Sequence, residues 1–428
     1  MILAVFRVRS FRFQLPADLL TSWAFEMETI ILGWYVMVHT GSVLLLTLFA
    51  SLQFLGTLAS PMFGVLGDRL GARVMLCAMR ATYALLAALM TLLALTGLLT
   101  TAWVFALATL AGVIRPNDLV MRNTLIGETI PPGHLMGALG MSRAIMDTAR
   151  VAGALAGAGL SSLLGLGPTY VFVTIFYLAS LALTFEVSRR RPVPDPVGAP
   201  LAAFSGPASV GAPRASRWRD LRDGLVHVAT TPALIAAMWL AFLINLTAYP
   251  VSSGLLPYVA LRVFLADATG LGWLVASFSF GGLLAAVTMV VTGGTRRPER
   301  STLVHTAIWY ALLLGFGHVH SLGAGLLLLF AAGFFQNVAM ISMSATLLAM
   351  AGERFRGRVM GVRQLAVYGM PLGLMASGAL IERIGYPLTI SVCCGIGLVF
   401  TLFIGMKWRA SMWQTRVTPR TPSIPQRV

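Results

Sequence analysis

The chain consists almost entirely of long apolar segments, and this feature constrains its fold more than any other. Runs of about 20 apolar residues follow one another between residues 15 and 406, separated by short polar turns. Of the 428 residues, 57% are hydrophobic and 11% are charged, and the mean hydropathy is +0.82. Segments of this length cross a bilayer as helices, because a helix satisfies its backbone hydrogen bonds internally. The short alternating segments of a membrane β-barrel are absent. The sequence therefore predicts an all-α membrane protein.

The apolar segments are numerous enough for twelve transmembrane helices in two groups of six. We expect spans at about residues 15–38, 43–66, 74–97, 101–121, 137–164, 168–187, 233–260, 270–292, 302–319, 322–348, 359–381 and 386–406. The stretch between the sixth and seventh spans is rich in Pro, Gly, Ala and Ser, and residues 216–225 have the spacing of a short amphipathic helix. We therefore predict an N-terminal six-helix bundle (1–188), a cytoplasmic linker with an amphipathic helix (189–230), a C-terminal six-helix bundle (231–406) and a cytoplasmic tail (407–428).

Basic residues occur mainly in alternate loops, which accounts for most of the net charge of +16. The opposite set of loops contains only Arg262 and Arg383. This asymmetry follows the positive-inside rule and predicts that both termini are cytoplasmic. A nucleic-acid-binding surface would not alternate in this way, so we expect no nucleic-acid partner. The three cysteines lie in apolar segments, and His318 and His320 have no third ligand nearby, so we expect neither a metal nor another cofactor.

A glycine-rich charged motif at residues 64–73 separates the second and third spans. It resembles the signature of the major facilitator superfamily, G-x-L-a-D-r-x-G-r-r, with matches at Gly64, Leu66, Asp68, Arg69, Gly71 and Arg73 and a departure at Ala72. Further stretches around residues 122–138, 220–225, 356–360 and 371–373 are similar to the branch that contains the enterobactin exporter and proton-driven drug exporters. The resemblance implies a secondary transporter with two bundles and a cytoplasmic gate at this motif.

Glu26 and Glu28 are candidates for proton binding because an ionisable group at membrane depth is costly unless it is paired or hydrated. On a helix they point about 200° apart, so only one of them faces a central path. Glu26 shares its side with small polar residues, whereas Glu28 matches a polar position of related exporters. We select Glu26 as the proton-binding carboxylate, with Glu28 as the competing choice. For either residue, the alternative is a glutamate paired inside the bundle without a transport role.

The fourth span contains Arg115, Asp118 and Arg122, whose spacing lets Asp118 pair with either arginine. Pro116 removes a backbone hydrogen bond and predicts a kink. An arginine in this helix assists proton exchange in related antiporters, and Arg115 is the nearest match. A role in the cytoplasmic gate is equally compatible, with Asp118 and Arg122 pairing with the turn that contains Asp68.

Arg143, Asp147 and Arg150 share one face of the fifth span and leave one surplus positive charge, which suits an anionic substrate but also fits a structural ladder. We assign Asp147 to proton coupling and the two arginines to substrate binding. Further along, residues 149, 153 and 157 are small, which predicts a close helix crossing. Antiporters usually have a G-x-x-x-G-P-x-x-G-G motif here, and Ala149 and Ala154 replace its first glycine and its proline.

Neutral polar residues in the C-terminal half are candidate substrate contacts, with interhelix hydrogen bonds as the alternative: Asn245, Gln336 and Asn337. No phosphate-binding loop or nucleophile motif is present, so we expect no enzyme. The leading prediction is a monomeric, proton-coupled exporter of a small amphipathic or anionic molecule, such as a siderophore, drug or natural product, in a bacterial cytoplasmic membrane. The alternatives are proton-coupled uptake and a scaffold or sensor that transports nothing.

Overall fold

The computed structural model describes residues 6, 8–130, 135–187, 226, 228–295, 297–351, 359–360 and 362–409, and these residues form helices without any strand. The N-terminal half contains α1 (Arg9–Thr40), α2 (Val43–Leu52), α3 (Gly56–Leu70), α4 (Ala72–Leu95), α5 (Thr101–Thr129), α6 (Leu135–Leu164) and α7 (Leu166–Phe185). The C-terminal half contains α9 (Pro232–Thr247), η3 (Pro250–Gly254), α10 (Leu256–Tyr258), η4 (Val259–Val263), α11 (Ala268–Val291), α12 (Pro298–Phe316), α13 (Leu322–Met350), η5 (Ala366–Tyr368), α15 (Gly369–Ile384) and α16 (Tyr386–Lys407). The predicted amphipathic helix and most of the linker and tail lie outside the described residues.

The helix lengths agree with a membrane protein. Eight described segments are long and apolar enough to cross a bilayer, among them Pro232–Val263, which joins α9 to η4, and Val362–Ile384, which contains η5 and α15. Helices α1, α6 and α12, with 32, 30 and 19 residues, and the α2–α3 pair have comparable lengths. The all-α class is therefore confirmed, and the described elements are consistent with the twelve predicted spans.

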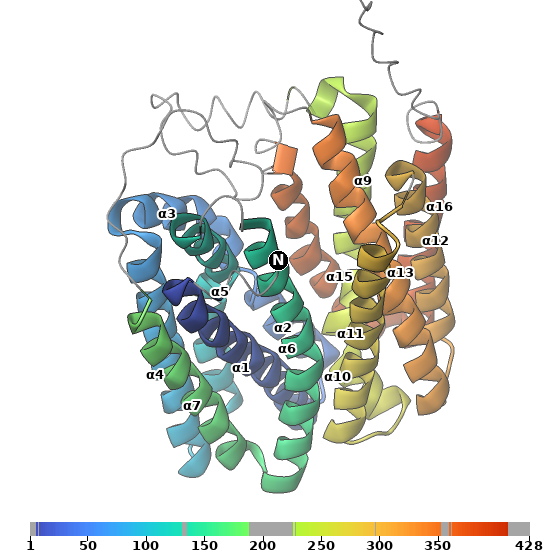
Figure 1. The fold of residues 1–428 in the computed structure, drawn as a ribbon. Helices are drawn as coiled ribbons and strands as arrows, with labels where there is room; N and C mark the ends of the chain where they lie inside the picture. The colour runs from blue at the N-terminus through green and yellow to red at the C-terminus, as the bar shows by residue number, and fades with distance from the viewer. Residues whose placement is uncertain are drawn as a thin grey trace, which may run out of the picture.

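Two groups of helices stand side by side, α1–α7 on the left of Figure 1 and α9–α16 on the right. We call the end where α1 begins and α7 ends the linker end, and the end with the turns at Gly41 and Gly385 the turn end. Helix α6 packs against α11, and α2 packs against α15. The hydrogen bonds across these two interfaces include Ser162 to Thr269, 3.2 Å, and Ser42 to Glu382, 3.2 Å. Both bonds lie at the turn end.

The second predicted span is interrupted rather than continuous. Helix α2 ends at Leu52 and α3 begins at Gly56. The break lies directly against α5, where a Cβ at residue 56 would be 2.0 Å from the carbonyl oxygen of Val113. The carbonyl of Gly56 accepts a hydrogen bond from the Asn117 amide at 3.0 Å. The third span also begins earlier than predicted. Helix α3 continues to Leu70, and the turn is confined to Gly71, whose φ of +86° favours glycine.

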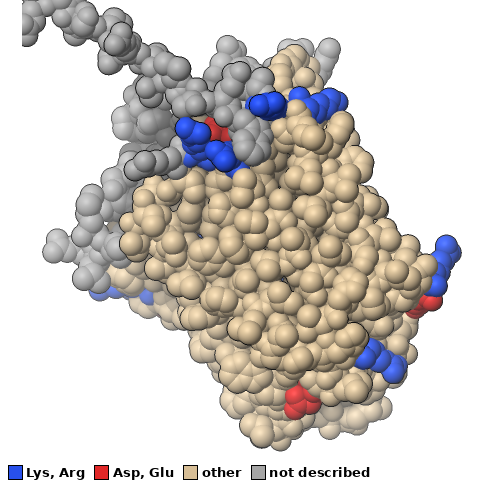
Figure 2. Space-filling model, turned by 90° about the vertical axis from the view of Figure 1, so that its right-hand side faces the viewer, with Lys and Arg blue, Asp and Glu red and all other residues tan. Residues whose placement is uncertain are grey.

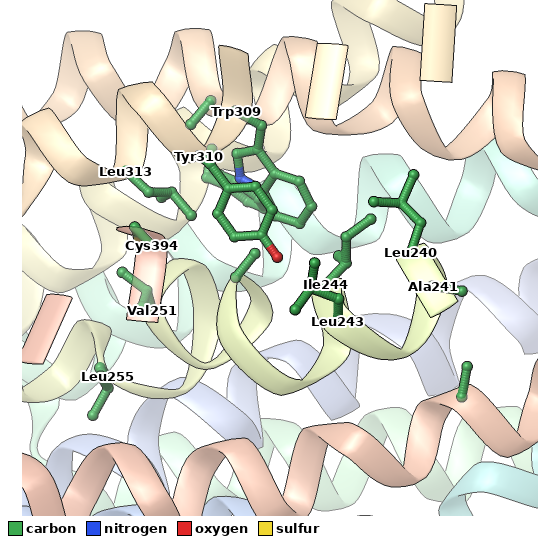
Figure 3. Packing of buried hydrophobic residues seen from close by; sticks show 14 of the residues in the cluster. Leu240, Ala241, Leu243, Ile244, Val251, Leu255, Trp309, Tyr310, Leu313 and Cys394 are labelled. Atoms are coloured by element: carbon green, nitrogen blue, oxygen red, sulfur yellow. The ribbon is translucent and has the colours of Figure 1, made fainter. Parts of the chain in front are cut away.

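Apolar packing fills each half. In the C-terminal half, Trp309 and Tyr310 of α12 lie beside Leu240 and Ile244 of α9 (Figure 3). The hydroxyl groups of Tyr310 and Thr247 are hydrogen-bonded at 2.6 Å within this core. On the outside, the face in Figure 2 carries charged side chains near its ends and margins and a broad area without them. This uncharged area is the surface expected to contact lipid acyl chains.

A stripe of small residues brings α1 and α6 together, as their spacing predicts. A Cβ at Gly153 would lie 2.8 Å from the Cβ of Glu26, and one at Gly157 would lie 2.8 Å from the Cα of Met27. Ala149, on the same stripe, is fully buried. The close crossing allows the side chain of Glu26 to reach Arg150 on α6.

Candidate functional site

Helix α1 carries three carboxylates, and each one contacts an arginine from another helix: Asp18, Glu26 and Glu28. The sequence analysis considered only the two glutamates. Asp18 lies within the predicted first span, as Arg80 lies within the third, so the presence of charge in an apolar segment was a usable signal for both. The three carboxylates belong to separate clusters with different exposure.

The first group, which we call the buried cluster, comprises Asp18, Arg80, Asp118 and Arg122. Asp18 pairs with Arg80 and lies 3.6 Å from the Nε of Arg122, which in turn pairs with Asp118. The Nη1 of Arg122 donates to the hydroxyl of Ser22 at 2.7 Å. All four charged side chains are at most 3% exposed, and their formal charges cancel. These contacts connect α1, α4 and α5 within one half.

The second group surrounds Glu28. Its carboxylate accepts from the Nη2 of Arg115 at 2.9 Å and from the Tyr177 hydroxyl at 2.9 Å. A longer bond of 3.4 Å comes from the Tyr170 hydroxyl. The Nη1 of Arg115 also donates to the side chain of Gln53 at the α2–α3 break, 2.6 Å. Glu28 is only 12% exposed, so this pair is largely enclosed by the N-terminal half.

The third group, the interface cluster, lies where α6 faces the C-terminal half and comprises Glu26, Arg143, Asp147, Arg150, Tyr249, Gln336 and Arg363. Glu26 accepts from the Nε of Arg150 at 3.3 Å, with side-chain exposures of 25% and 45%. Arg143 lies 3.5 Å from Asp147 one turn earlier. The cluster therefore holds the most accessible of the three α1 pairs.

The C-terminal half completes the interface cluster. Tyr249 accepts a hydrogen bond from Gln336 of α13 at 2.8 Å and lies within electrostatic range of both Arg150 and Arg363. Arg363 donates to Ser344 at 3.1 Å and lies within electrostatic range of Arg143 on the opposite half. The sequence analysis did not single out Arg363. Its position in the eleventh predicted span was the available signal.

Comparison with protein-family models gives a match to the Major Facilitator Superfamily over residues 17–294 and 238–426, which together cover both halves. The chain belongs to the major facilitator superfamily. This assignment agrees with the paired helical bundles and with charged clusters inside and between them, and it identifies a transporter fold rather than an enzyme. A comparison with curated proteins found no match.

Solved structures of major facilitator transporters share the fold. One is a bacterial homologue of the human lysosomal transporter Spinster in an inward-facing, unoccupied conformation, with a TM-score of 0.69, 13% identity and coverage of 95% of this chain and 99% of that one. The human organic anion transporter MFSD10 has a TM-score of 0.61 and 16% identity, with coverage of 92% of this chain and 99% of that one. A POT family transporter in complex with 5-aminolevulinic acid has a TM-score of 0.68 and 10% identity, with coverage of 95% of this chain and 97% of that one. At these identities the likeness concerns the fold alone.

The structure selects among the pairings that the sequence of this major facilitator chain left open. Asp118 pairs with Arg122 inside the buried cluster and not with Arg115, which contacts Glu28. In the predicted ladder, Asp147 forms an ion pair with Arg143, whereas Arg150 forms one with Glu26 and lies within electrostatic range of Asp147. Arg115 and Arg150 both pair with glutamates of helix α1, and spacing within a single helix cannot reveal such interhelical partners.

Two of the three neutral candidates make structural hydrogen bonds. The Asn245 amide donates to the Ala241 carbonyl of its own helix at 2.9 Å. The Asn337 amide donates to the carbonyl of Gly282 on α11 at 2.5 Å. The Asn337 bond is an interhelix hydrogen bond, the stated alternative to substrate contact, whereas the Asn245 bond stays within its helix and Gln336 donates to Tyr249 in the interface cluster.

The signature motif of the superfamily forms the end of α3 and the α3–α4 turn. Arg69 is exposed, and Arg73 donates to the Phe185 carbonyl at the end of α7. The side chain of Asp68 lies outside the described part, so the gate contacts predicted for Gly64 and Asp68 stay predictions. Asp118 and Arg122, which were assigned to the same gate, have partners in the buried cluster.

Two pockets lie between the halves. One, of about 240 Å³, is at the turn end and is lined by Gly41, Ser42, Val43, Tyr258, Arg262, Ile381 and Glu382. The other, of about 250 Å³, is beside the α2–α3 break and is lined by Gln53, Phe54, Thr57, Arg115, Pro116, Gln364 and Val367. Arg115 therefore joins the enclosed Glu28 group to a space between the halves.

Proposed function

We propose that the protein is a proton-coupled transporter of small organic anions, in which Glu26 binds the proton and Arg150 binds the anion. The observation that carries this proposal is the ion pair between Glu26 and Arg150 in the partly exposed interface cluster. Both side chains are accessible, and the cluster includes residues from both halves. A group in this position contacts both the substrate path and the surfaces that move in alternating access.

The contact between Glu26 and Arg150 defines the coupling. While Glu26 is ionised, it neutralises Arg150 and competes with an incoming anion for the guanidinium. A proton on Glu26 removes that competition, so anion binding and proton binding favour each other. Thermodynamic linkage makes the effect reciprocal: a bound anion favours protonation of Glu26 as much as protonation favours the anion. The proton and the anion are then carried in the same direction.

This coupling favours uptake over the export predicted from the sequence. An inward proton gradient drives a co-transported anion into the cell, whereas an exporter that exchanges protons for substrate needs the two to compete for one site. Arg150 and the other arginines of the interface cluster are suited to binding anions. An anion on Arg150 and a proton on Glu26 do not compete for one site.

The contacts between the halves support an inward-open state. Two hydrogen bonds between the halves lie at the turn end, and two others, from Ser51 to the Pro371 carbonyl and from Tyr368 to the Thr57 carbonyl, lie beside the α2–α3 break. The Spinster homologue with the same fold is inward-facing and unoccupied. If the linker end is cytoplasmic, as the basic loops predict, the interface cluster is reached from the cytoplasm in this state. We place the protein in a bacterial cytoplasmic membrane, with both termini inside and without a requirement for a partner subunit.

The test uses reconstituted vesicles of known orientation with an enclosed pH dye. Addition of an organic anion from a panel of organic acids, siderophores and acidic drugs should acidify the compartment that the anion enters. Glu26→Gln should abolish this proton movement yet retain exchange of labelled anion, because its amide no longer neutralises Arg150. Glu186→Gln, an exposed carboxylate at the end of α7, is the matched control and should behave as the unchanged protein.

Three results would count against the proposal. Proton movement opposite to the anion would establish exchange and return export to first place. Normal coupling in Glu26→Gln with loss in Glu28→Gln would move the proton site to the Glu28–Arg115 group. Absence of any anion movement at normal membrane insertion would favour the scaffold alternative.

A further inference from the structure

Arg363 is the feature of the interface cluster that the proposed function leaves unused. It lies near the start of the helix Val362–Ile384, and the Ser344 hydroxyl, 3.1 Å from its Nη1, holds it in place. Among the residues that the structure describes, no carboxylate lies within ion-pair distance of Arg363. By contrast, Arg143 and Arg150 each have a carboxylate partner.

A second guanidinium, in the other half, lies near enough to Arg363 for the two charges to interact. Arg143 of α6 is within electrostatic range of Arg363, and its side chain is 59% exposed. Two like charges on opposing surfaces repel each other, and the repulsion is stronger where water is excluded. Closure of the two halves over these residues is therefore unfavourable unless an anion lies between them.

The charges of the interface cluster indicate how much negative charge it needs. Its three arginines and two carboxylates give +3 − 2 = +1 when both carboxylates are ionised. Protonation of Glu26 raises this to +2. An uncompensated charge inside a membrane protein is costly, so the occluded state is most favourable when the bound molecule carries two negative charges.

From these contacts we infer that the transported molecule is a dianion, an organic diacid. One acidic group binds Arg150 after Glu26 is protonated, and the other bridges Arg143 and Arg363. A carboxylate suits this bridge because its two oxygens can each accept from a different guanidinium, and arginine offers the fixed donor geometry for such contacts. The bridge also links the two halves, so the second acidic group provides attraction where the empty protein has repulsion. This inference rests on the proposed role of Glu26.

Binding measurements on the purified protein test the second acidic site without any proton gradient. The probes are phthalate and succinate, each compared with its monomethyl ester, which removes one charge and changes little else. Affinity is measured from ligand-induced thermal stabilisation, in the unchanged protein and in a Glu26→Gln background, where the amide replaces the protonated carboxyl group. Each diacid should bind more tightly than its ester, and more tightly still in the Glu26→Gln background.

Arg363→Gln should lower diacid affinity by about 10- to 100-fold, the range expected for loss of a charged hydrogen bond, with little effect on the esters. Arg363→Lys should recover part of the preference, because it keeps the charge but not the planar donor pair. Arg383→Gln, on the same helix near the turn end, is the matched control and should bind both probes normally.

Equal affinity for diacid and ester, an equal loss of both in Arg363→Gln, or no binding of either diacid would overturn the inference. The vesicle experiment distinguishes this failure from failure of the proposed function. Proton-coupled movement of monoanions with no preference for diacids would refute the dianion site alone. A diacid preference that depends on Arg363, without proton movement in vesicles, would keep the site and refute the coupling through Glu26.

Discussion

Asp18→Asn is the substitution whose effect on stability the structure defines best. The buried cluster contains two carboxylates and two arginines, so its formal charge is +2 − 2 = 0, and the side chains of Asp18 and Arg80 are 2% and 0% exposed. The substitution leaves a net charge of +1 without access to water. Removal of one partner from a buried pair costs about 3–5 kcal/mol, and we expect that loss for Asp18→Asn. Arg80→Gln produces the opposite imbalance and should cost a similar amount.

The double variant Asp18→Asn/Arg80→Gln is the decisive comparison. It restores a net charge of zero and leaves the pair of Asp118 and Arg122 intact. Its loss of stability should therefore be smaller than the sum of the two single losses, with a coupling energy of about 1–3 kcal/mol. The assay is thermal unfolding in detergent, followed by size-exclusion chromatography of the folded fraction, together with the amount of protein inserted in the membrane.

A control substitution separates charge burial from loss of a carboxylate as such. Asp147→Asn breaks a pair whose arginine is 59% exposed, so its effect on stability should be about 0–1 kcal/mol. Strictly additive losses in the double variant would refute the assignment of Asp18 and Arg80 to one electrostatic unit. A single variant Asp18→Asn as stable as the unchanged protein would refute the burial of the cluster itself.

Two further predictions concern packing and the contact between the halves. Gly333→Ala should lower stability by about 1–3 kcal/mol in the same unfolding assay, because its Cβ would lie 1.9 Å from the Phe278 carbonyl oxygen. Gly395→Ala, which meets no atom within 4 Å, is its control and should be neutral or slightly stabilising. Cysteines at positions 42 and 382, where Ser42 and Glu382 are hydrogen-bonded, should cross-link most readily in the empty protein and then block transport. Cross-linking that increases with bound anion would contradict the inward-open interpretation.

The main features of the fold were predictable because they depend on local properties of the sequence. Apolar segment length predicts membrane helices regardless of their neighbours, and the observed helices follow the predicted spans closely. The small residues Gly153 and Gly157 predicted a close crossing, which brings α6 against α1. The break between α2 and α3 was not predictable, since no proline lies at residues 53–55, between the two helices.

The candidate site was predictable as a set of residues but not as a set of contacts. Spacing on a helix correctly separates Glu26 from Glu28, which contact α6 and α5 respectively. Spacing also made Arg115 a candidate partner of Asp118. The structure assigns Arg115 to Glu28, because the rotation of neighbouring helices decides which buried charges meet. The interaction of Arg363 with Arg143 depends on how the two halves approach each other, and no pattern within one segment predicts that approach.

The position of a pair relative to the two halves decides which α1 carboxylate can couple protons to transport. The pairs of Asp18 and Glu28 connect α1 with α4, α5 and α7, all within the N-terminal half. If the halves move as units, the distances within these pairs change little, and the same holds for the pair of Glu26 and Arg150, because α1 and α6 belong to one half. The partners of both glutamates lie near the other half, since Arg115 lines a pocket with Gln364 and Val367 and Arg150 lies within electrostatic range of Tyr249. Glu26 differs in its exposure, which is 25% against 12% for Glu28. Its surroundings change when the halves move, and this dependence on both halves is the physical requirement for coupling.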